Sequence, residues 1–176
     1  MEEPLSDLKS FILELLENGT RSVKLAMDGL TEKQLYFIPI GGTNSIAWLA
    51  WHLSRYRDAI TSLVVGELQV WITEGWAMRF DMKPEGDGIG DTPAQVTAFR
   101  PNLSLLSGYV DAVHTTGIKR ITRMTDEQLN RVGVYVSPNE RPAWRALVSM
   151  IGDSGQHSGQ INYVRGMVSG FGWRSG

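Results

Sequence analysis

The chain has 176 residues, a length that fits one ordinary globular domain, and we expect a single domain over residues 1–176. One fifth of the residues are charged and the formal net charge is −2, which excludes both the basic field of a nucleic-acid-binding protein and a like-charged tail. The chain contains no cysteine, so disulfides, thiolate metal sites and a cysteine nucleophile are excluded, and any metal ligand must be His, Asp or Glu.

The first residues, MEEPLSDLKS, are acidic and lack the basic start and the apolar run of a signal peptide. Nowhere does the chain approach the ~18 uninterrupted apolar residues that a membrane span needs. We therefore expect a cytoplasmic protein whose partners include neither nucleic acid nor a membrane.

Two helices are predicted in the first third of the chain. Apolar residues recur at three- and four-residue intervals from about Leu5 to Leu30, as in an amphipathic helix. A second helix is predicted from Asn44 or Ser45, which are good N-cap residues after the breaker run PIGGT, toward Gly66.

A loop-rich tract follows, roughly from Glu67 to Asp91, and it includes Trp71, Trp76 and the segment PEGDGIGD. So long a connection in a small domain is typical of a functional loop or of a crossover between helices that are not adjacent. The two tryptophans are candidates for substrate contact. The run GDGIG matches neither of the glycine patterns that bind phosphate.

Two more helices are predicted in the second half. Thr92, Pro93 and Gln95 provide three helix start signals together, and the spacing predicts a helix from there to about Met124. After the extended piece VGVYVSPNER, a fourth helix is predicted from about Pro142. Four long amphipathic helices with at most a short strand pair predict an all-α four-helix bundle with a long crossover connection.

A short internal echo links the two halves of the chain. LTEKQL (residues 30–35) and MTDEQL (residues 124–129) share the Thr-x-x-Gln capping-box pattern, and an irregular connection to the next helix follows each. The echo indicates either two related helix pairs or two unrelated short turns.

The three histidines of the chain are His52, His114 and His157. His52 and His157 each fall within an apolar stripe with helical spacing, so we expect both to point inward. Asp153 precedes His157 by four residues and therefore shares its face of the helix. The stripe of the second helix is Ser45, Leu49, His52, Tyr56, Ala59 and Leu63, and that of the fourth is Ala146, Met150, Asp153, His157, Ile161 and Val164.

A carboxylate on an inward face needs a partner, because burying an unpaired charge is costly. Three arrangements satisfy this need: an Asp–His hydrogen bond alone, a network with Gln156, Gln160 or Tyr56, or a divalent cation bound by His52, Asp153 and His157. The last arrangement leaves coordination positions open for water or substrate, as a reactive metal site requires.

The remaining polar and glycine features are expected to be structural. His114 has no acidic or histidine partner four residues away, so a structural or surface role is predicted. Trp48 and Trp51 are expected to pack between helices. Gly155 and Gly159 lie off the Asp153/His157 face and are expected to allow close approach of a neighbouring helix or of a second subunit.

Two stretches, GLTEKQLYFIPIGGTNSIAWLAWHLSRYRD (residues 29–58) and DSGQHSGQINYVRG (residues 153–166), resemble the DinB/YfiT-like bundle proteins, and with the helix order the resemblance covers nearly the whole chain. In that family a histidine of the second helix and an H-x-x-x-H pair of the fourth bind a divalent metal, commonly zinc or nickel. The resemblance thus implies a metal site at His52 and His157. Asp153 replaces the first histidine of the pair; the mycothiol-dependent isomerase branch has a glutamate there, one methylene longer, so both direct and water-bridged ligation of Asp153 stay open.

The resemblance also implies an activity. Characterised relatives are S-transferases and isomerases that use low-molecular-weight thiols such as mycothiol or bacillithiol, and some are metal-dependent hydrolases. We therefore expect a metal-dependent thiol S-transferase or isomerase that acts on a small-molecule electrophile, with homodimerisation. The alternatives are a metal-dependent hydrolase and a non-catalytic, stress-related bundle or dimerisation protein.

Overall fold

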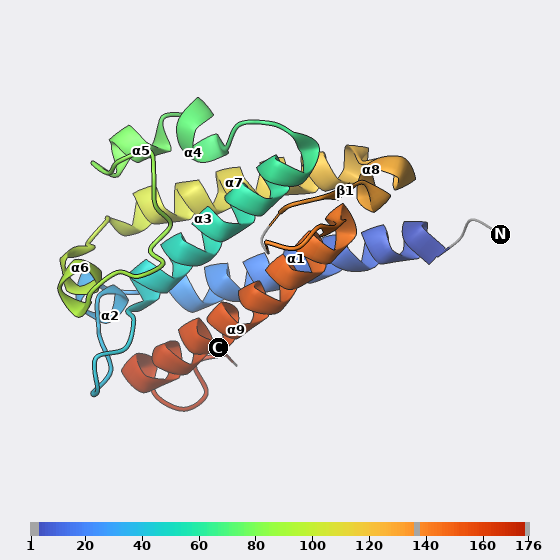
Figure 1. Cartoon of the computed structure of the whole chain (residues 1–176). Coiled ribbons are helices and arrows are strands. Elements are labelled where there is room, and N and C mark those ends of the chain that lie inside the picture. The colour runs from blue at the N-terminus through green and yellow to red at the C-terminus, as the bar shows by residue number, and fades with distance from the viewer. Residues whose placement is uncertain (1–3, 136–137, 175–176) are drawn as a thin grey trace.

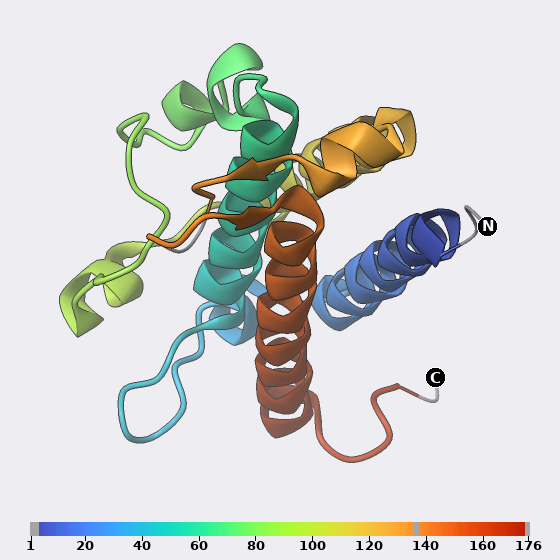
Figure 2. The same cartoon turned by 45° about the vertical axis from the view of Figure 1, so that its right-hand side comes forward.

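Four long helices form the bundle in the computed structural model, which describes residues 4–135 and 138–174 (Figure 1). They are α1 (Pro4–Met27), α3 (Ile46–Val65), α7 (Leu103–Arg123) and α9 (Ala143–Ser169). α3 packs against α7 and α9, and α1 packs against the same two helices, so α1 and α3 occupy opposite corners of the bundle (Figure 2). The predicted all-α fold is confirmed.

Short elements complete the described chain. The helices are α2 (Glu32–Leu35), α4 (Val70–Thr73), α5 (Trp76–Arg79), α6 (Pro93–Ala98) and α8 (Asp126–Asn130), and the strands are β1 (Val132–Gly133) and β2 (Arg141–Pro142). β1 and β2 pair antiparallel, with Val132 opposite Pro142. Except for Pro142, this pair lies within the predicted extended piece VGVYVSPNER, of which residues 136–137 lie outside the described residues.

The crossover between α3 and α7 follows from the direction of the two helices. Both run from the left of Figure 1 to the right, so the chain must return along the bundle before α7 begins. The return path carries α4, α5 and α6 and spans residues 66–102. The long crossover connection predicted from the sequence is therefore present.

The prediction of one continuous helix from Thr92 to about Met124 was wrong in one respect, because this segment forms two helices, α6 and α7. Thr92 and Gln95 do form the predicted capping box, but α6 ends at Ala98 and α7 begins at Leu103. Pro101 has no N–H group and disfavours the helical conformation of the residue before it, which ends α6. Asn102 then accepts a hydrogen bond from Leu105 N at 2.8 Å and starts α7 as its N-cap.

The two capping boxes of the internal echo are also present, and each opens a short helix of its own. Thr31 caps α2 and Thr125 caps α8, each through a Gln three residues later. The first long helix accordingly ends at Met27, earlier than the predicted Leu30. The order α1–α2–α3 thus repeats as α7–α8–α9, which favours the interpretation of two related helix pairs.

The predicted inward stripe of α9 is confirmed at its ends, whereas that of α3 is only partly correct. Ala146, Met150 and Ile161 are fully buried. On α3, Leu49 is buried but Leu63 is 44% exposed, so its predicted place in the core was wrong. Periodicity identifies the apolar face of a helix but not what covers it, and the last turns of α3 border a cavity.

A buried ionic cluster ties the crossover to the bundle. Asp58 on α3 is fully buried and accepts hydrogen bonds from Val70 N at 2.9 Å and from Trp71 N at 2.8 Å. Arg120 on α7 donates to the same carboxylate at 3.0 Å and to Glu67 at 3.1 Å. Because a buried charge is stable only with partners, this cluster fixes α4 against both α3 and α7.

None of the helices in residues 4–135 and 138–174 combines the length and the apolar character that crossing a bilayer requires.

Candidate metal centre

The packing of α3 against α9 brings the three predicted ligands together. The rings of His52 and His157 lie edge to face, with centroids 4.9 Å apart and planes at 88°. His157 Nε2 lies 3.5 Å from Asp153 Oδ1 on the same helix. Two imidazoles and one carboxylate therefore converge between the two helices.

The ring of His52 is held on two sides. Its Nδ1 is hydrogen-bonded to the backbone carbonyl of Asp87, and since a carbonyl only accepts, Nδ1 carries a proton, which leaves the lone pair of the neutral ring on Nε2. The indole of Trp48 stacks on the imidazole, with centroids 4.7 Å apart and planes at 14°. Such support by outer groups orients metal-ligating histidines.

The ring of His157 lies between two oxygen acceptors. Its Nδ1 is 2.8 Å from Gln160 Oε1, and its Nε2 faces Asp153 Oδ1. The pKa of His157 is raised above its ordinary value, mainly by the hydrogen bond to Asp153 and despite partial burial. With the Nδ1 proton donated to Gln160 Oε1, a neutral ring would direct its Nε2 lone pair at the carboxylate, so in this arrangement the Nε2 edge requires a proton or another cation.

Asp153 is less buried than its stripe predicts, because one third of its side chain is exposed at the edge of the site. Its Oδ2 atom is nevertheless buried, and it has no hydrogen-bond partner in the described part of the chain. The nearby guanidinium of Arg57 donates instead to Ser154 Oγ at 2.9 Å and to Thr20 Oγ1 at 2.7 Å. Burial lowers the pKa of Arg57 to about 10, opposed by the charge of Asp153.

These residues fit a divalent ion in chemistry and proximity, but their geometry is not a finished ligand shell. Among the residues that the structure describes, no three His, Asp or Glu side chains are already placed to hold a metal ion. The fit rests on the free Nε2 of His52, the adjacent ring of His157 and the unpartnered Oδ2 of Asp153. Binding would require the contact between Asp153 and His157 to open by side-chain rotation.

The glycine-rich loop contributes to the site, which the sequence reasoning missed. The Asp87 carbonyl orients His52, and buried Gly88 lies against the indole of Trp48. Gly88 has φ +94°, and a Cβ built there would lie 2.6 Å from the Trp48 ring. The sequence signal that could have indicated this contact is the glycine run of PEGDGIGD, because glycines allow a loop to approach bulky side chains such as Trp48 and Trp51 closely.

Several expected structural roles can be compared with the described geometry. His114 lies apart from the candidate site, 3.1 Å from Thr20 Oγ1 and 2.8 Å from Glu17 Oε2. Trp51 is buried among aromatic rings of the core. A Cβ at Gly155 or Gly159 would meet nothing within 4 Å. The prediction that these glycines allow close approach of a neighbouring helix of this chain was therefore wrong.

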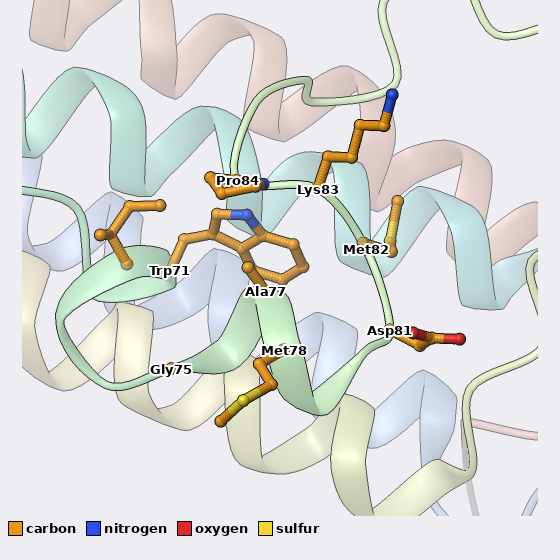
Figure 3. A pocket seen from close by; sticks show the side chains of 9 residues that line it. Trp71, Gly75, Ala77, Met78, Asp81, Met82, Lys83 and Pro84 are labelled. Carbon is orange, nitrogen blue, oxygen red and sulfur yellow. The ribbon is translucent and has the colours of Figure 1, made fainter.

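Trp71 and Trp76, the suspected substrate contacts, are core residues that are 0% and 4% exposed. Trp71 also lines a cavity of about 740 Å³ between α4, α5 and the loop that follows (Figure 3). Its indole faces Ala77 and Pro84, whereas the Lys83 side chain points away. None of the three candidate ligands lines this cavity.

Comparison with known proteins gives the family and the fold. The sequence model described as the DinB superfamily matches residues 15–161. The crystal structure of a conserved protein from Enterococcus faecalis is similar, with a TM-score of 0.81 and 25% identity over 90% of this chain and 95% of that one. No functionally curated protein matches the chain.

Proposed function

The chain belongs to the DinB superfamily, and from that premise we propose that it is a divalent-metal-dependent enzyme whose ion is held by His52, Asp153 and His157. The observation that carries the proposal is the meeting of two imidazoles from facing helices, with ring centroids 4.9 Å apart, beside a buried carboxylate oxygen that has no hydrogen-bond partner among the described residues. Nitrogen and oxygen donors of this kind suit zinc or nickel.

The chain's own residues would prepare the site. His52 offers Nε2 because the Asp87 carbonyl holds the proton on Nδ1. Asp153 supplies the negative charge, and His157 offers Nε2 once its proton leaves. The bound ion would lower the pKa of a thiol or water molecule, so that a nucleophile exists near neutral pH.

The reaction that we propose is thiol S-transfer or thiol-dependent isomerisation. The chain has no cysteine, so the thiol has to be a low-molecular-weight cosubstrate such as mycothiol or bacillithiol. In transfer to an epoxide, a sulfur–carbon bond forms, the carbon–oxygen bond of the ring breaks and the oxygen takes a proton. In isomerisation the thiol adds to a double bond and leaves again, so it is not consumed.

Metal content tests the binding half of the proposal. Protein purified without an affinity tag or added metal should contain a stoichiometric divalent ion, or should gain melting temperature when Zn²⁺ or Ni²⁺ is added. A wild-type protein that contains no stoichiometric divalent ion and gains no melting temperature with Zn²⁺ or Ni²⁺ would contradict the proposal.

Turnover tests the chemical half. Metal-loaded protein should consume a thiol together with an epoxide or a chloroarene, or isomerise a cis-enone with the thiol as catalyst. Turnover with water alone would identify a metal-dependent hydrolase instead.

The described geometry also supports a second candidate, a non-catalytic bundle. In it, Asp153, His157 and Gln160 form a hydrogen-bonded set without metal, consistent with the lack of a ready three-ligand group in the described residues. Failure of Zn²⁺ and Ni²⁺ to bind, with normal folding, would favour this candidate.

A further inference from the structure

A second cavity, of about 510 Å³, begins next to the candidate metal centre and follows the outer side of α3. Tyr56, one turn beyond His52, and Asp87, whose carbonyl orients His52, both line it. The volume lies within the range of small-molecule sites. We call this cavity the α3 groove.

The walls of the α3 groove are mainly aliphatic. They come from α3, from the segment that follows it and from the glycine-rich loop. The aliphatic lining residues are Ala59, Ile60, Leu63, Leu68, Ile72, Pro84 and Ile89. Leu63, Leu68 and Ile89 are 44%, 70% and 76% exposed, so the groove keeps apolar surface in water that a ligand would cover.

The charges around the α3 groove disfavour an anionic ligand. Its described lining includes no Arg, Lys or His. The two carboxylates that do line it are engaged: Glu67 with Arg120 and Arg123, at 3.1 and 2.9 Å, and Asp87 Oδ1 with Ile89 N at 3.0 Å. A carboxylate or phosphate bound between the aliphatic walls, away from the Tyr56 end, would lose water without meeting a cation in the described lining.

Tyr56 provides one polar group at the inner end. Its hydroxyl has no hydrogen-bond partner within the described residues, although Asp153, Asp87 and Arg141 are near enough to act on it electrostatically. Burial and the two carboxylates raise its pKa, so the phenol keeps its proton and can donate a hydrogen bond.

From these observations we propose that the α3 groove binds the apolar arm of an uncharged substrate, with an oxygen acceptor of the substrate bound by the Tyr56 hydroxyl. This inference rests on the proposed function, since it gives the electrophile a chemical class: neutral, with an alkyl or aryl arm and a carbonyl or epoxide oxygen. The acceptor then lies at the end of the groove nearest His52.

Direct binding tests the α3 groove without turnover. The uncharged fluorophore N-phenyl-1-naphthylamine should bind the metal-free protein saturably, and 1-decanol should displace it at concentrations at least about tenfold lower than decanoate does. Equal displacement by decanoate would overturn the assignment of an uncharged ligand.

Matched variants locate the binding. Leu63→Asp should weaken binding of the fluorophore at least about tenfold, because it places a charge in the apolar wall. Val148→Asp is the control, since Val148 is also 44% exposed and lies on α9 outside the groove. Circular dichroism checks that both variants fold, and Ala59→Phe, which fills the groove, gives a second test without a new charge. Equal binding by Leu63→Asp, Ala59→Phe and the wild type would overturn the proposal.

The role of Tyr56 has its own readout. Tyr56→Phe should weaken displacement by 2-decanone roughly threefold to tenfold, the value of one hydrogen bond, and should leave binding of the fluorophore unchanged. An unchanged affinity for 2-decanone would remove Tyr56 from the proposal. Fluorophore binding without metal binding would leave the groove as a ligand site while the metal proposal fails, and the reverse result would reject the groove alone.

Discussion

The imidazole of His52 on α3 meets the imidazole of His157 on α9 edge to face, at a centroid distance of 4.9 Å. Each ring is fixed from behind by an oxygen acceptor on Nδ1, the Asp87 carbonyl for His52 and Gln160 Oε1 for His157. Their Nε2 atoms are therefore the nitrogens available for a shared cation.

Removing either imidazole should abolish metal binding. We expect His52→Ala and His157→Ala each to eliminate the rise in melting temperature that Zn²⁺ produces in the wild type, because each loses a ligand. His114→Ala should keep the rise, since His114 contacts Thr20 and Glu17 instead. Thermal melts with and without Zn²⁺ make the comparison, and loss of the Zn²⁺ effect in His114→Ala would show that the site has been misplaced.

The stability of the metal-free protein should depend on the protonation of His157. The pKa of His157 is raised above 6.5 in the folded state, chiefly by the hydrogen bond to Asp153. The protonated ring therefore stabilises the fold fully below pH 6.5, and this stabilisation is lost as the pH rises through the raised pKa. The difference in melting temperature between the wild type and His157→Gln should shrink over that window. A difference that stays constant across it would contradict the assignment, and Asp153→Asn should remove most of the pH dependence.

Asp58 should be among the residues most important for stability. Asp58→Ala leaves Arg120 and two backbone N–H groups without their buried acceptor, and we expect a loss of about 3–5 kcal/mol in the free energy of unfolding. Asp111→Ala is the control: it breaks an ion pair with Lys24 that is half-exposed, so it should cost less than about 1 kcal/mol. Urea unfolding measures both, and similar losses would show that the buried cluster has no special role.

Gly88 and Gly90 separate backbone strain from close packing. Both have positive φ, +94° and +84°, but only at Gly88 would a Cβ meet an indole. Gly90→Ala should cost about 1 kcal/mol from strain, and Gly88→Ala should cost more because Trp48 must move. Gly88→Ala should also weaken Zn²⁺ binding about tenfold by shifting the Asp87 carbonyl that orients His52. Equal effects of the two variants on stability and on Zn²⁺ affinity would contradict this account.

We propose that the protein forms a homodimer through the exposed glycine face of α9. Contacts within one chain do not test this proposal, but substitutions on that face can. If a second subunit packs on Gly155 and Gly159, light scattering should find a dimer for the wild type and a monomer for Gly155→Arg. Thr115→Arg, at an exposed position of α7, should remain dimeric. A monomeric wild type would reject the dimer, and the glycine face would then be only a solvated surface.

Much of the fold could be predicted from local signals. Helix periodicity and N-caps such as Ser45 and Thr92 act within a few residues, so they can be identified without knowledge of the partners. The division of the predicted third helix into α6 and α7 also has a local cause, the breaker Pro101 and the N-cap Asn102. The prediction missed it because the apolar spacing continues across both residues. The spacing also placed Asp153 and His157 on one face of α9.

Local sequence signals specify which helices form, which of their faces are apolar, and that the candidate ligands lie on two of those faces. Which of these faces meet depends on how the whole chain packs. Packing of α3 on α9 set His52 against His157, and the return of the crossover brought the Asp87 carbonyl to His52. It also left Leu63 in an open groove instead of the core. The physical reason is range: caps and periodicity act over one or two turns, whereas contacts between distant segments depend on how all the helices share one core.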